Sequence, residues 1–376
     1  MIRGEKEFLE LLKAGLWNAP LDLSLFSPST DWERIQQLAK EQTVMGIITD
    51  GLSSVPKEKQ GARPVMMRFY ARTMALEDEN RKMNAFAPQL MMQLERKGVH
   101  SLLLKGAGVA QCYSQPTHRV VGDIDLLVID EQEYDKARKL MLMIAKEVEG
   151  EDVERKHSAF QYKGMTIEVH GDFRFYINQT CRTKTPAWKR NRLSEEGCRV
   201  KEGVLAGAML PPVQFDVIFI FAHMLGHYMG AGGVGLRQVS DWMMYLNRHY
   251  EEIDLQELED DLNFIGIRRY WEVFGAMAVG SLGFPKERMP LYDASNTKKG
   301  RMVLENIFKT GNFGALQRKE QLKGNANPVL KKIVTLVGQV TVYARNLRVF
   351  PKDTLWCFRQ FIASALRGYQ SKPLPE

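Results

Sequence analysis

Two aspartates stand two residues apart at the start of an apolar run, Gly122-Asp123-Ile124-Asp125-Leu126-Leu127-Val128. The run predicts a strand, and residues two apart on a strand project to the same face, about 6.5–7 Å apart along it. Two carboxylates this close repel each other unless a divalent cation lies between them. Pairs of such cations stabilise the attacking and leaving oxygens of a phosphoryl displacement. The spacing is typical of a site for metal-assisted phosphoryl chemistry, and the alternative is a solvated strand end.

A third carboxylate usually completes such a metal cage, and Glu168 is the best candidate for it. The alternation in Phe160-Gln161-Tyr162 and Ile167-Glu168-Val169-His170, around a turn at 163–165, predicts a β-hairpin. If its second strand pairs with the strand that carries the aspartates, Glu168 meets them and His170 faces the same side. The alternative is that Glu168 is an outward residue of the hairpin.

A glycine turn precedes the aspartates along the chain. The apolar run 101–104 leads into Lys105-Gly106-Ala107-Gly108, and we expect a helix from Val109 to Tyr113. Gly106 lets backbone N–H groups approach a phosphate, and a following helix N-terminus adds a favourable dipole. Lys105 would neutralise an outgoing pyrophosphate, unless it lies in solvent as most lysines do.

Helical patterns surround this unit and must position it. Asp31 is the expected N-cap of a helix that buries Trp32, Ile35, Leu38 and Ala39. The segment 65–97 repeats the pattern, and the segment 131–144 is also expected to be helical. The expected inward residues of the segment 65–97 are Phe69, Leu76, Met83, Phe86 and Leu90.

Beyond Pro211-Pro212 the pattern is helical to the end, with breaks at 230–235 and 324–328. We divide the chain into a helical N-terminal region (1–98), a mixed α/β core (99–205) and a helical C-terminal region with a basic tail (206–376). Apolar helix faces are expected to bury four methionines: Met141, Met143, Met243 and Met244.

The composition narrows the class of protein. The 376 residues are 44% hydrophobic and 26% charged, which excludes disorder as the dominant state and allows two or three domains. No run approaches the ~18 apolar residues of a membrane-spanning helix, and the N-terminus lacks a signal-peptide pattern, so we expect a cytoplasmic protein. No paired Cys spacing occurs, so we expect free thiols at Cys112, Cys181, Cys198 and Cys357.

The net charge of +7 is unevenly distributed. Residues 296–376 carry 15 Lys and Arg against 4 acidic residues, a balance of +11, and the remainder is −4. An apolar helix face is expected from Leu355, Phe358, Ile362 and Leu366, with Arg359 and Arg367 elsewhere. This region is either a solvated helical surface or a contact for a polyanion, such as nucleic acid or acidic lipid.

At this point the sequence resembles a known family. The motif 103–106, Tyr113, Pro116, Arg119 and the run 122–128 look like the signature of the bacterial uncharacterised nucleotidyltransferase family. That family lies within the DNA polymerase β-like nucleotidyltransferase superfamily. The segment 167–170 and the later His223, His227, Arg237 and Asp241 also match, and the similarity extends from about residue 30 to 250.

The resemblance implies an α+β fold with a small mixed-sheet nucleotidyltransferase core between two helical regions. It implies that Asp123, Asp125 and Glu168 hold Mg²⁺, as two ions, and that the turn at Gly106 holds NTP phosphates. We place the nucleotide among Lys105, Gly106, Arg119, His170, Arg237 and Asp241. The chain departs from the wider superfamily at Ala107, which supplies no hydroxyl to a phosphate, and in a longer spacing to Asp123.

Two residue pairs after Pro212 have helical spacing. His223 and His227 are four apart without the Glu of a zinc motif, which favours packing or pocket lining over a zinc site. Arg237 and Asp241 are also four apart, so they share a face and either point into a common pocket or form a surface ion pair.

These patterns predict a Mg²⁺-dependent enzyme that moves a nucleoside monophosphate from an NTP to an acceptor, with pyrophosphate leaving. The acceptor is more readily a small molecule or a protein than RNA, because the basic region lacks the interleaved aromatic stacking motifs of an RNA-reading surface. Two alternatives are a nucleotide-binding regulatory protein without turnover, which Ala107 favours, and an RNA-directed nucleotidyltransferase, which the basic region favours.

Overall fold

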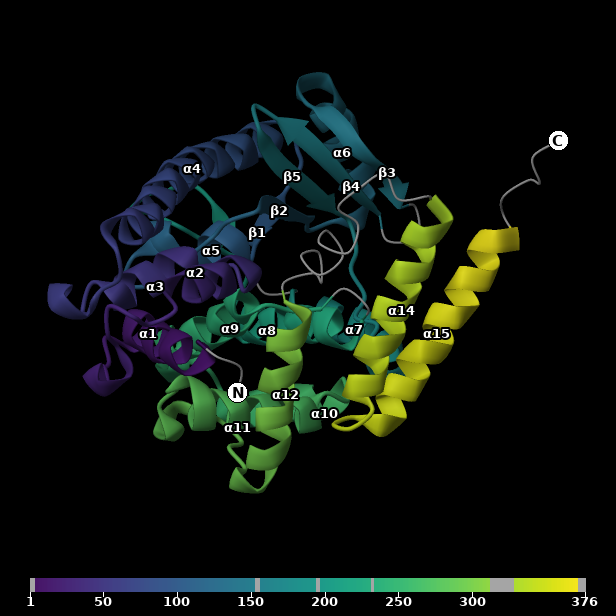
Figure 1. Ribbon diagram of the computed structural model, residues 1–376. Coiled ribbons are helices and arrows are strands. Elements are labelled where there is room, and N and C mark those ends of the chain that lie inside the picture. Colours follow the sequence, from purple (N-terminus) through teal and green to yellow (C-terminus); the bar gives the residue numbers. More distant parts are fainter. Residues whose placement is uncertain (1–3, 153–155, 194–196, 231–232, 312–327, 371–376) are drawn as a thin grey trace.

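The computed structural model describes residues 4–152, 156–193, 197–230, 233–311 and 328–370. Figure 1 shows a β-sheet on one side of the molecule, a layer of helices next to it, and further helices beyond that layer. Within the described ranges, no helix combines the length and the apolar character that crossing a membrane requires.

Four helices make up the N-terminal region: α1 (Glu5–Trp17), α2 (Trp32–Glu41), α3 (Met45–Leu52) and α4 (Arg63–Arg96). The predicted cap of α2 is confirmed, because Asp31 Oδ1 accepts a hydrogen bond of 3.1 Å from the backbone N–H of Arg34. The inward faces expected for α2 and α4 are also buried, except that Phe86 is half-buried and stacks on Tyr162.

A five-stranded mixed sheet forms the middle of the chain, in the order β1-β2-β5-β4-β3. Its strands are β1 (Ser101–Leu104), β2 (Asp123–Val128), β3 (Lys146–Asp152), β4 (His157–Tyr162) and β5 (Met165–His170). The predicted hairpin is the β4–β5 pair, and β5 pairs in parallel with β2 at the centre of the sheet. The second strand of the hairpin therefore lies beside the strand that carries the aspartates, as the sequence suggested.

The helix after the glycine turn differs from the prediction. It is α5 (Gly106–Ala110) rather than a helix over residues 109–113. Lys105 and Gly106 both have positive φ, 48° and 43°, so the chain reverses at the end of β1 and enters the helix at once. The helix ends before Tyr113, whose side chain packs in the core and bonds to a residue of a distant helix.

Helix α6 (Tyr134–Ile144) packs against β4 and β5. Met141 is buried, but Met143 is 81% exposed, so its expected place in the core is wrong. The two residues are 200° apart around a helix with 3.6 residues per turn, and only one of them can face the sheet. A two-stranded sheet, β6 (Cys198–Arg199) and β7 (Met209–Leu210), follows α7 (Gln179–Arg192).

Helices α8 (Val213–Met229) and α9 (Leu236–Arg248) lie next to the sheet, with the helices beyond them on the other side (Figure 1). Those further helices are α10 (Leu255–Phe264), α11 (Arg268–Leu282) and α12 (Thr297–Thr310). Met243 and Met244 are buried here, as expected. Short 3₁₀ turns occur at Leu23–Leu25, Lys57–Lys59, Pro116–His118, Glu131–Glu133, Tyr250–Glu252, Lys286–Arg288 and Ala294–Asn296.

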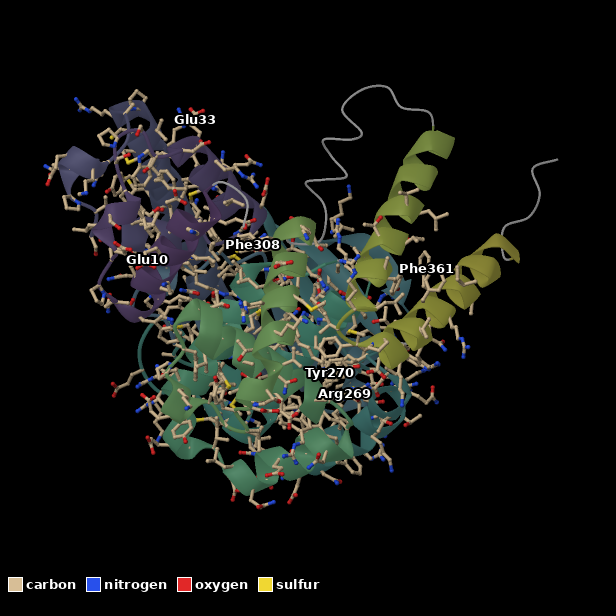
Figure 2. The ribbon with its side chains drawn as sticks, turned by 60° about the horizontal axis from the view of Figure 1, so that its bottom comes forward. Glu10, Glu33, Arg269, Tyr270, Phe308 and Phe361 are labelled. Carbon is tan, nitrogen blue, oxygen red and sulfur yellow. The ribbon has the colours of Figure 1, made fainter. Side chains whose placement is uncertain are left out.

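One large apolar core connects the N-terminal helices with those after residue 212. The rings of Phe8 and Phe308 meet edge to face at 5.7 Å, and Figure 2 shows Phe308 where α12 meets the N-terminal helices. A second core lies between α4, the sheet and α6. All four cysteines are free thiols, as predicted.

The chain ends in a helix pair, α14 (Pro328–Asn346) and α15 (Pro351–Gln370), at the side of the molecule (Figure 1). Arg269 and Tyr270 of α11 contact Asp353 near the start of α15 (Figure 2). The predicted amphipathic stretch lies on helix α15, where Leu355 and Ile362 are exposed and Phe358 packs on Tyr343 of α14. The side chain of Leu366 and residues 324–327 of the predicted break at 324–328 lie outside the described residues.

Candidate active site

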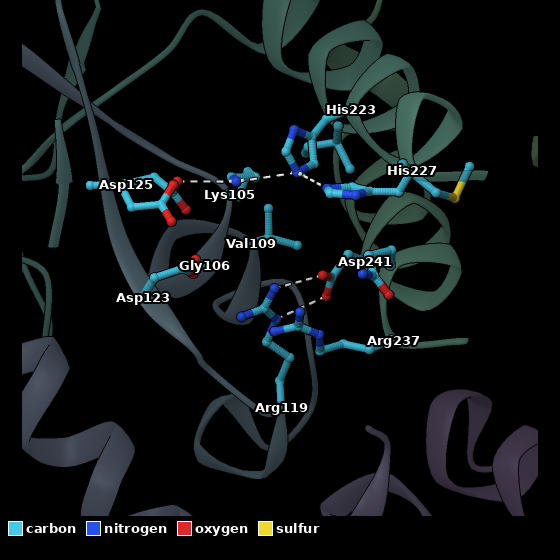
Figure 3. A pocket seen from close by; sticks show the side chains of 14 residues that line it. Lys105, Gly106, Val109, Arg119, Asp123, Asp125, His223, His227, Arg237 and Asp241 are labelled. Atoms are coloured by element: carbon cyan, nitrogen blue, oxygen red, sulfur yellow. Dashed lines mark hydrogen bonds and ion pairs between the residues drawn. The ribbon is translucent and has the colours of Figure 1, made fainter. Parts of the chain in front are cut away.

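One pocket gathers most of the side chains that the sequence selected for chemistry (Figure 3). It lies where the β1–α5 turn and the strands β2 and β5 face helices α8 and α9. Its lining includes Lys105, Gly106, Arg119, Asp123, Asp125, Glu168, His223, His227, Arg237 and Asp241. His170 contacts two of these residues, Asp125 and Glu168.

Three carboxylates lie together on the two central strands. The parallel pairing of β2 and β5 sets Asp125 opposite Glu168, and Asp123 lies on the same face because strand side chains alternate. One oxygen from each carboxylate lies within 4.8 Å of the others. The buried Oδ2 of Asp125 has no hydrogen-bond partner among the described residues. This set of oxygen donors suits a hard divalent cation.

The carboxylates interact strongly in the metal-free protein. The nearby charge of Asp125, together with burial, raises the pKa of Asp123 to about 6. Burial alone would raise the pKa of Asp125 as well, but Lys105 and His170 more than offset this and lower it. Asp123 is thus the group in this cluster that takes up a proton most readily, and a cation would relieve its repulsion from Asp125.

Lys105 is the counter-ion of this cluster. Its Nζ lies 3.1 Å from Asp125 Oδ1 and 3.2 Å from His223 Nε2, as Figure 3 shows. Burial opposes the charge, yet the three carboxylates outweigh burial and raise the pKa of Lys105. The side chain is therefore held inward on Asp125, and its backbone adopts a φ that is unusual for a residue other than glycine.

His170 bridges two of the carboxylates. Its Nε2 lies 3.1 Å from Asp125 Oδ1 and 3.4 Å from Glu168 Oε2. Burial opposes protonation of the ring, but these two contacts raise the pKa of His170. Burial likewise opposes ionisation of Glu168, and the imidazoles of His157 and His170 lower its pKa in spite of it. The imidazolium form of His170 stabilises the negative charge here when no metal is bound.

Two arginines lie across the pocket from the carboxylates (Figure 3). Arg119 donates twice to Asp241, with Nε–Oδ1 2.9 Å and Nη2–Oδ2 2.6 Å, and the Tyr113 hydroxyl donates to the same Oδ1 at 2.8 Å. Arg237 instead donates from Nη1 to the carbonyl of Val120 at 3.0 Å. The charge partner of Asp241 is thus Arg119, from a distant part of the chain, and not the helical neighbour Arg237.

Each arginine also has one nitrogen that no hydrogen bond within the described parts of the chain satisfies. Arg119 Nη1 and Arg237 Nε are buried and have no hydrogen-bond partner among the described residues. Burial and the neighbouring charge of Arg119 lower the pKa of Arg237. A buried donor without a partner is costly, and an anion in this pocket would remove that cost. A phosphate suits guanidinium groups best, because it accepts their forked hydrogen bonds.

Gly106 lines the same pocket between the two charged sides. A Cβ at this position would lie 3.4 Å from the carbonyl oxygen of Asp123, which is an ordinary contact. The positive φ of 43°, rather than space, is therefore what favours glycine here. Helix α5 has only five residues, so the arginines and Lys105 supply most of the positive charge that faces the pocket.

His223 and His227 line the pocket from α8. Their Nε2 atoms lie 3.1 Å apart, and His223 also contacts Lys105. Burial holds the pKa of His223 well below its usual value, and burial with the charge of Lys105 lowers the pKa of His227 to about 4. Both rings are therefore neutral near neutral pH and act as hydrogen-bonding groups rather than as charges.

One residue of this cluster, His157 on β4, was not predicted from the sequence. Its Nε2 lies 3.3 Å from Glu168 Oε2. The sequence did contain a signal for His157, because the hairpin turn at 163–164 fixes a register in which His157 is opposite His170. The expected strand began only at Phe160, and this shorter strand left His157 out.

A mixed sheet with acidic residues on adjacent central strands, facing arginines across a pocket, is consistent with a nucleotidyltransferase domain. A sequence model of one such family, the uncharacterised nucleotidyltransferases, matches residues 28–279, and the chain belongs to that family. Comparisons with curated proteins and with solved structures found no match. Family membership supports a general role in nucleotidyl transfer.

Proposed function

We propose that this protein catalyses Mg²⁺-dependent transfer of a nucleoside monophosphate from an NTP to an acceptor. The observation that carries the proposal is the division of one pocket into an acidic side, with Asp123, Asp125 and Glu168, and a side with unpaired donors on Arg119 and Arg237. The acidic side of such a pocket would bind the metal of a metal–triphosphate complex, and the arginine side would bind its phosphates. A bond would form between an acceptor oxygen and the α-phosphorus as the bond to pyrophosphate breaks.

The residues present fit the cation that this chemistry requires. The three carboxylates offer the oxygen ligands that Mg²⁺ prefers, and the unpartnered Oδ2 of Asp125 is a free ligand position in a buried place. Asp123, Asp125 and Glu168 would hold either one Mg²⁺ ion or two. Bound there, Mg²⁺ supplies charge neutralisation at the phosphates and activation of the acceptor hydroxyl.

The other side chains of the pocket bind and orient in this proposal. Arg119 and Arg237 donate to phosphate oxygens, and Asp241 fixes the plane of the Arg119 guanidinium through its two hydrogen bonds. Gly106 allows the backbone turn that brings these groups together. Lys105 neutralises the carboxylates in the metal-free protein, and its charge becomes available to the pyrophosphate once cations replace it at Asp125.

A small molecule or a protein suits the acceptor better than RNA, since the aromatic residues of the basic C-terminal region pack inward: Tyr343 and Phe350 are buried, and Phe358 and Phe361 pack against the core. The test is incubation of the protein with each α-labelled NTP, Mg²⁺ and cell extract, followed by identification of the labelled product. Label transfer that Asp123→Asn abolishes would support the proposal. Label confined to RNA would favour an RNA-directed enzyme, and an absence of both transfer and pyrophosphate release would contradict the proposal.

One observation favours a second candidate, a nucleotide-binding regulatory protein without turnover. Lys105 and His170 both lie 3.1 Å from Asp125 Oδ1, so this carboxylate is charge-compensated without a metal. Ala107 also supplies no hydroxyl to a phosphate. Nucleotide binding that is insensitive to Mg²⁺ and releases no pyrophosphate would support this candidate over the enzyme.

A further inference from the structure

A histidine pair lies beside the carboxylate cluster, on the strands that form the hairpin. His157 of β4 is directly opposite His170 of β5, and Ala159 is opposite Glu168. Side chains at directly opposite and diagonal positions on one face of an antiparallel pair reach one another. The register therefore brings His157, Glu168 and His170 to one face. Their side chains are 22%, 26% and 17% exposed, so small solutes reach them.

Two imidazole nitrogens converge on the same carboxylate oxygen. The distance to Glu168 Oε2 is 3.3 Å from His157 Nε2 and 3.4 Å from His170 Nε2. Charge-assisted hydrogen bonds between nitrogen and oxygen are shorter, about 2.7–2.9 Å. Two ligands of a tetrahedral zinc-type site, each about 2.0–2.1 Å from the metal, are about 3.3–3.4 Å apart. Both observed distances agree with the edge length of such a tetrahedron.

We propose that His157 Nε2, His170 Nε2 and Glu168 Oε2 form a binding site for a divalent transition-metal ion such as Zn²⁺ or Co²⁺. Two imidazoles and one carboxylate suit these ions, whereas Mg²⁺ prefers oxygen ligands alone. Three protein ligands leave a fourth tetrahedral position open to water. The three ligand atoms lie within 4.8 Å of one another in the metal-free structure, so binding requires little rearrangement.

This site is distinct from the proposed magnesium site, although Glu168 belongs to both. It uses His157, which does not line the nucleotide pocket, and it does not use Asp123. Binding of the ion needs neither a nucleotide nor turnover, so the inference goes beyond the proposed function. Through Glu168, an ion held by the histidines lies next to the carboxylates that would bind Mg²⁺.

The test is a titration of the full chain with Co²⁺ alone, followed by visible absorption, because four-coordinate Co²⁺ gives intense bands that hydrated Co²⁺ lacks. The variants are His157→Gln and Asp123→Asn. The matched control is His100→Gln. His100 makes a similar 3.3 Å contact with Glu133, but among the described residues it belongs to no group of three potential metal ligands. Circular dichroism checks that each variant is folded.

We expect wild-type protein, Asp123→Asn and His100→Gln to bind one Co²⁺ with these bands, and His157→Gln to bind it at least about tenfold more weakly. Binding that survives in His157→Gln but is lost in Asp123→Asn would overturn the proposal, as would no binding at all. An Asp123→Asn variant that binds Co²⁺ but no longer transfers label from an NTP would also show that this inference and the proposed function can be tested separately.

A second measurement needs no variant and covers the case in which His157→Gln does not fold. In ¹⁵N spectra of the wild-type imidazoles, Zn²⁺ should shift the Nε2 resonances of His157 and His170 and leave that of His100 unchanged. Unshifted resonances of His157 and His170 at saturating Zn²⁺ would overturn the proposal.

Discussion

Lys105 Nζ lies 3.1 Å from Asp125 Oδ1, and the side chain of Asp125 is completely buried. The turn that we expected to present a phosphate site thus also supplies the counter-ion of the carboxylate that we propose as a metal ligand. Breaking such a buried pair by removing one partner is strongly destabilising, because the other charge remains buried alone. If Asp125 binds a metal, the pair would link the stability of the fold to the occupancy of the proposed metal site.

Lys105→Met should destabilise the metal-free protein by about 3–5 kcal/mol, since Asp125 loses its lysine partner and the other two carboxylates lose a nearby positive charge. Added Mg²⁺ should restore more stability to this variant than to the wild type, because the ion takes over the neutralising charge. Denaturant unfolding of both proteins with EDTA and with Mg²⁺ measures this. Equal stability of the two proteins in EDTA would contradict the role of Lys105.

Asp123→Asn should abolish metal-dependent turnover and stabilise the metal-free fold. The folded pKa of Asp123, about 6, lies above its usual value of 3.8, so the ionised group destabilises the folded state at higher pH. The gain at about pH 8 should be on the order of 3 kcal/mol, and it should be lost as the pH falls through about 6 to below 3.8, where Asp123 is protonated in both the folded and the unfolded state. Melting temperatures in EDTA across this pH range test the sign.

Asp125→Asn should also abolish turnover, but with the opposite effect on the fold. The folded pKa of Asp125 is lowered by Lys105 and His170, so its ionised form is stabilising. The amide would leave Lys105 without its closest partner, and we expect a loss of several kcal/mol at neutral pH. A melting temperature of Asp125→Asn above that of the wild type would show that repulsion from Asp123 outweighs the lysine pair.

Arg237→Lys should weaken NTP binding about tenfold while stability changes little, because lysine keeps the charge but loses the forked donors. The matched control is Arg248→Lys, an exposed arginine at the end of the same helix. Calorimetric titration of nucleotide into both variants measures the difference. If both bind NTP as the wild type does, Arg237 is not a phosphate ligand.

The basic C-terminal region should bind polyanions if it has a role beyond solvation. Truncation would disturb the core, since Tyr343 and Phe350 are buried in it, so charge reversal at Arg348, Lys352 and Arg359, which are exposed, is the better test. The triple Glu variant should show weaker RNA or anionic-vesicle binding, with a salt slope shallower by about 0.9 per lost contact. If the wild-type protein binds neither RNA nor anionic vesicles at low salt, this region is a solvated surface.

Local sequence patterns were sufficient to predict where much of the candidate site lies. The spacing of Asp123 and Asp125 within one strand puts both on the same face whatever surrounds them, because strand side chains alternate. The hairpin that carries Glu168 was also predictable, since alternation and a two-residue glycine turn are local signals. Where a boundary was wrong, as at α5, the backbone reversal at Lys105 and Gly106 had no clear local signature, because lysine seldom adopts positive φ.

Charge partners required the fold. Arg119 and Asp241 are 122 residues apart, and Lys105 and His223 are 118 apart, so no spacing along the chain predicts either contact. The helical neighbours Arg237 and Asp241 looked like a pair because residues four apart on a helix share a face. Packing of α9 against the β1–β2 connection gave Asp241 a bidentate partner in Arg119 and left Arg237 with an unpaired nitrogen. Sequence periodicity fixes the face on which a side chain lies, whereas the packing of distant elements selects which group it meets there.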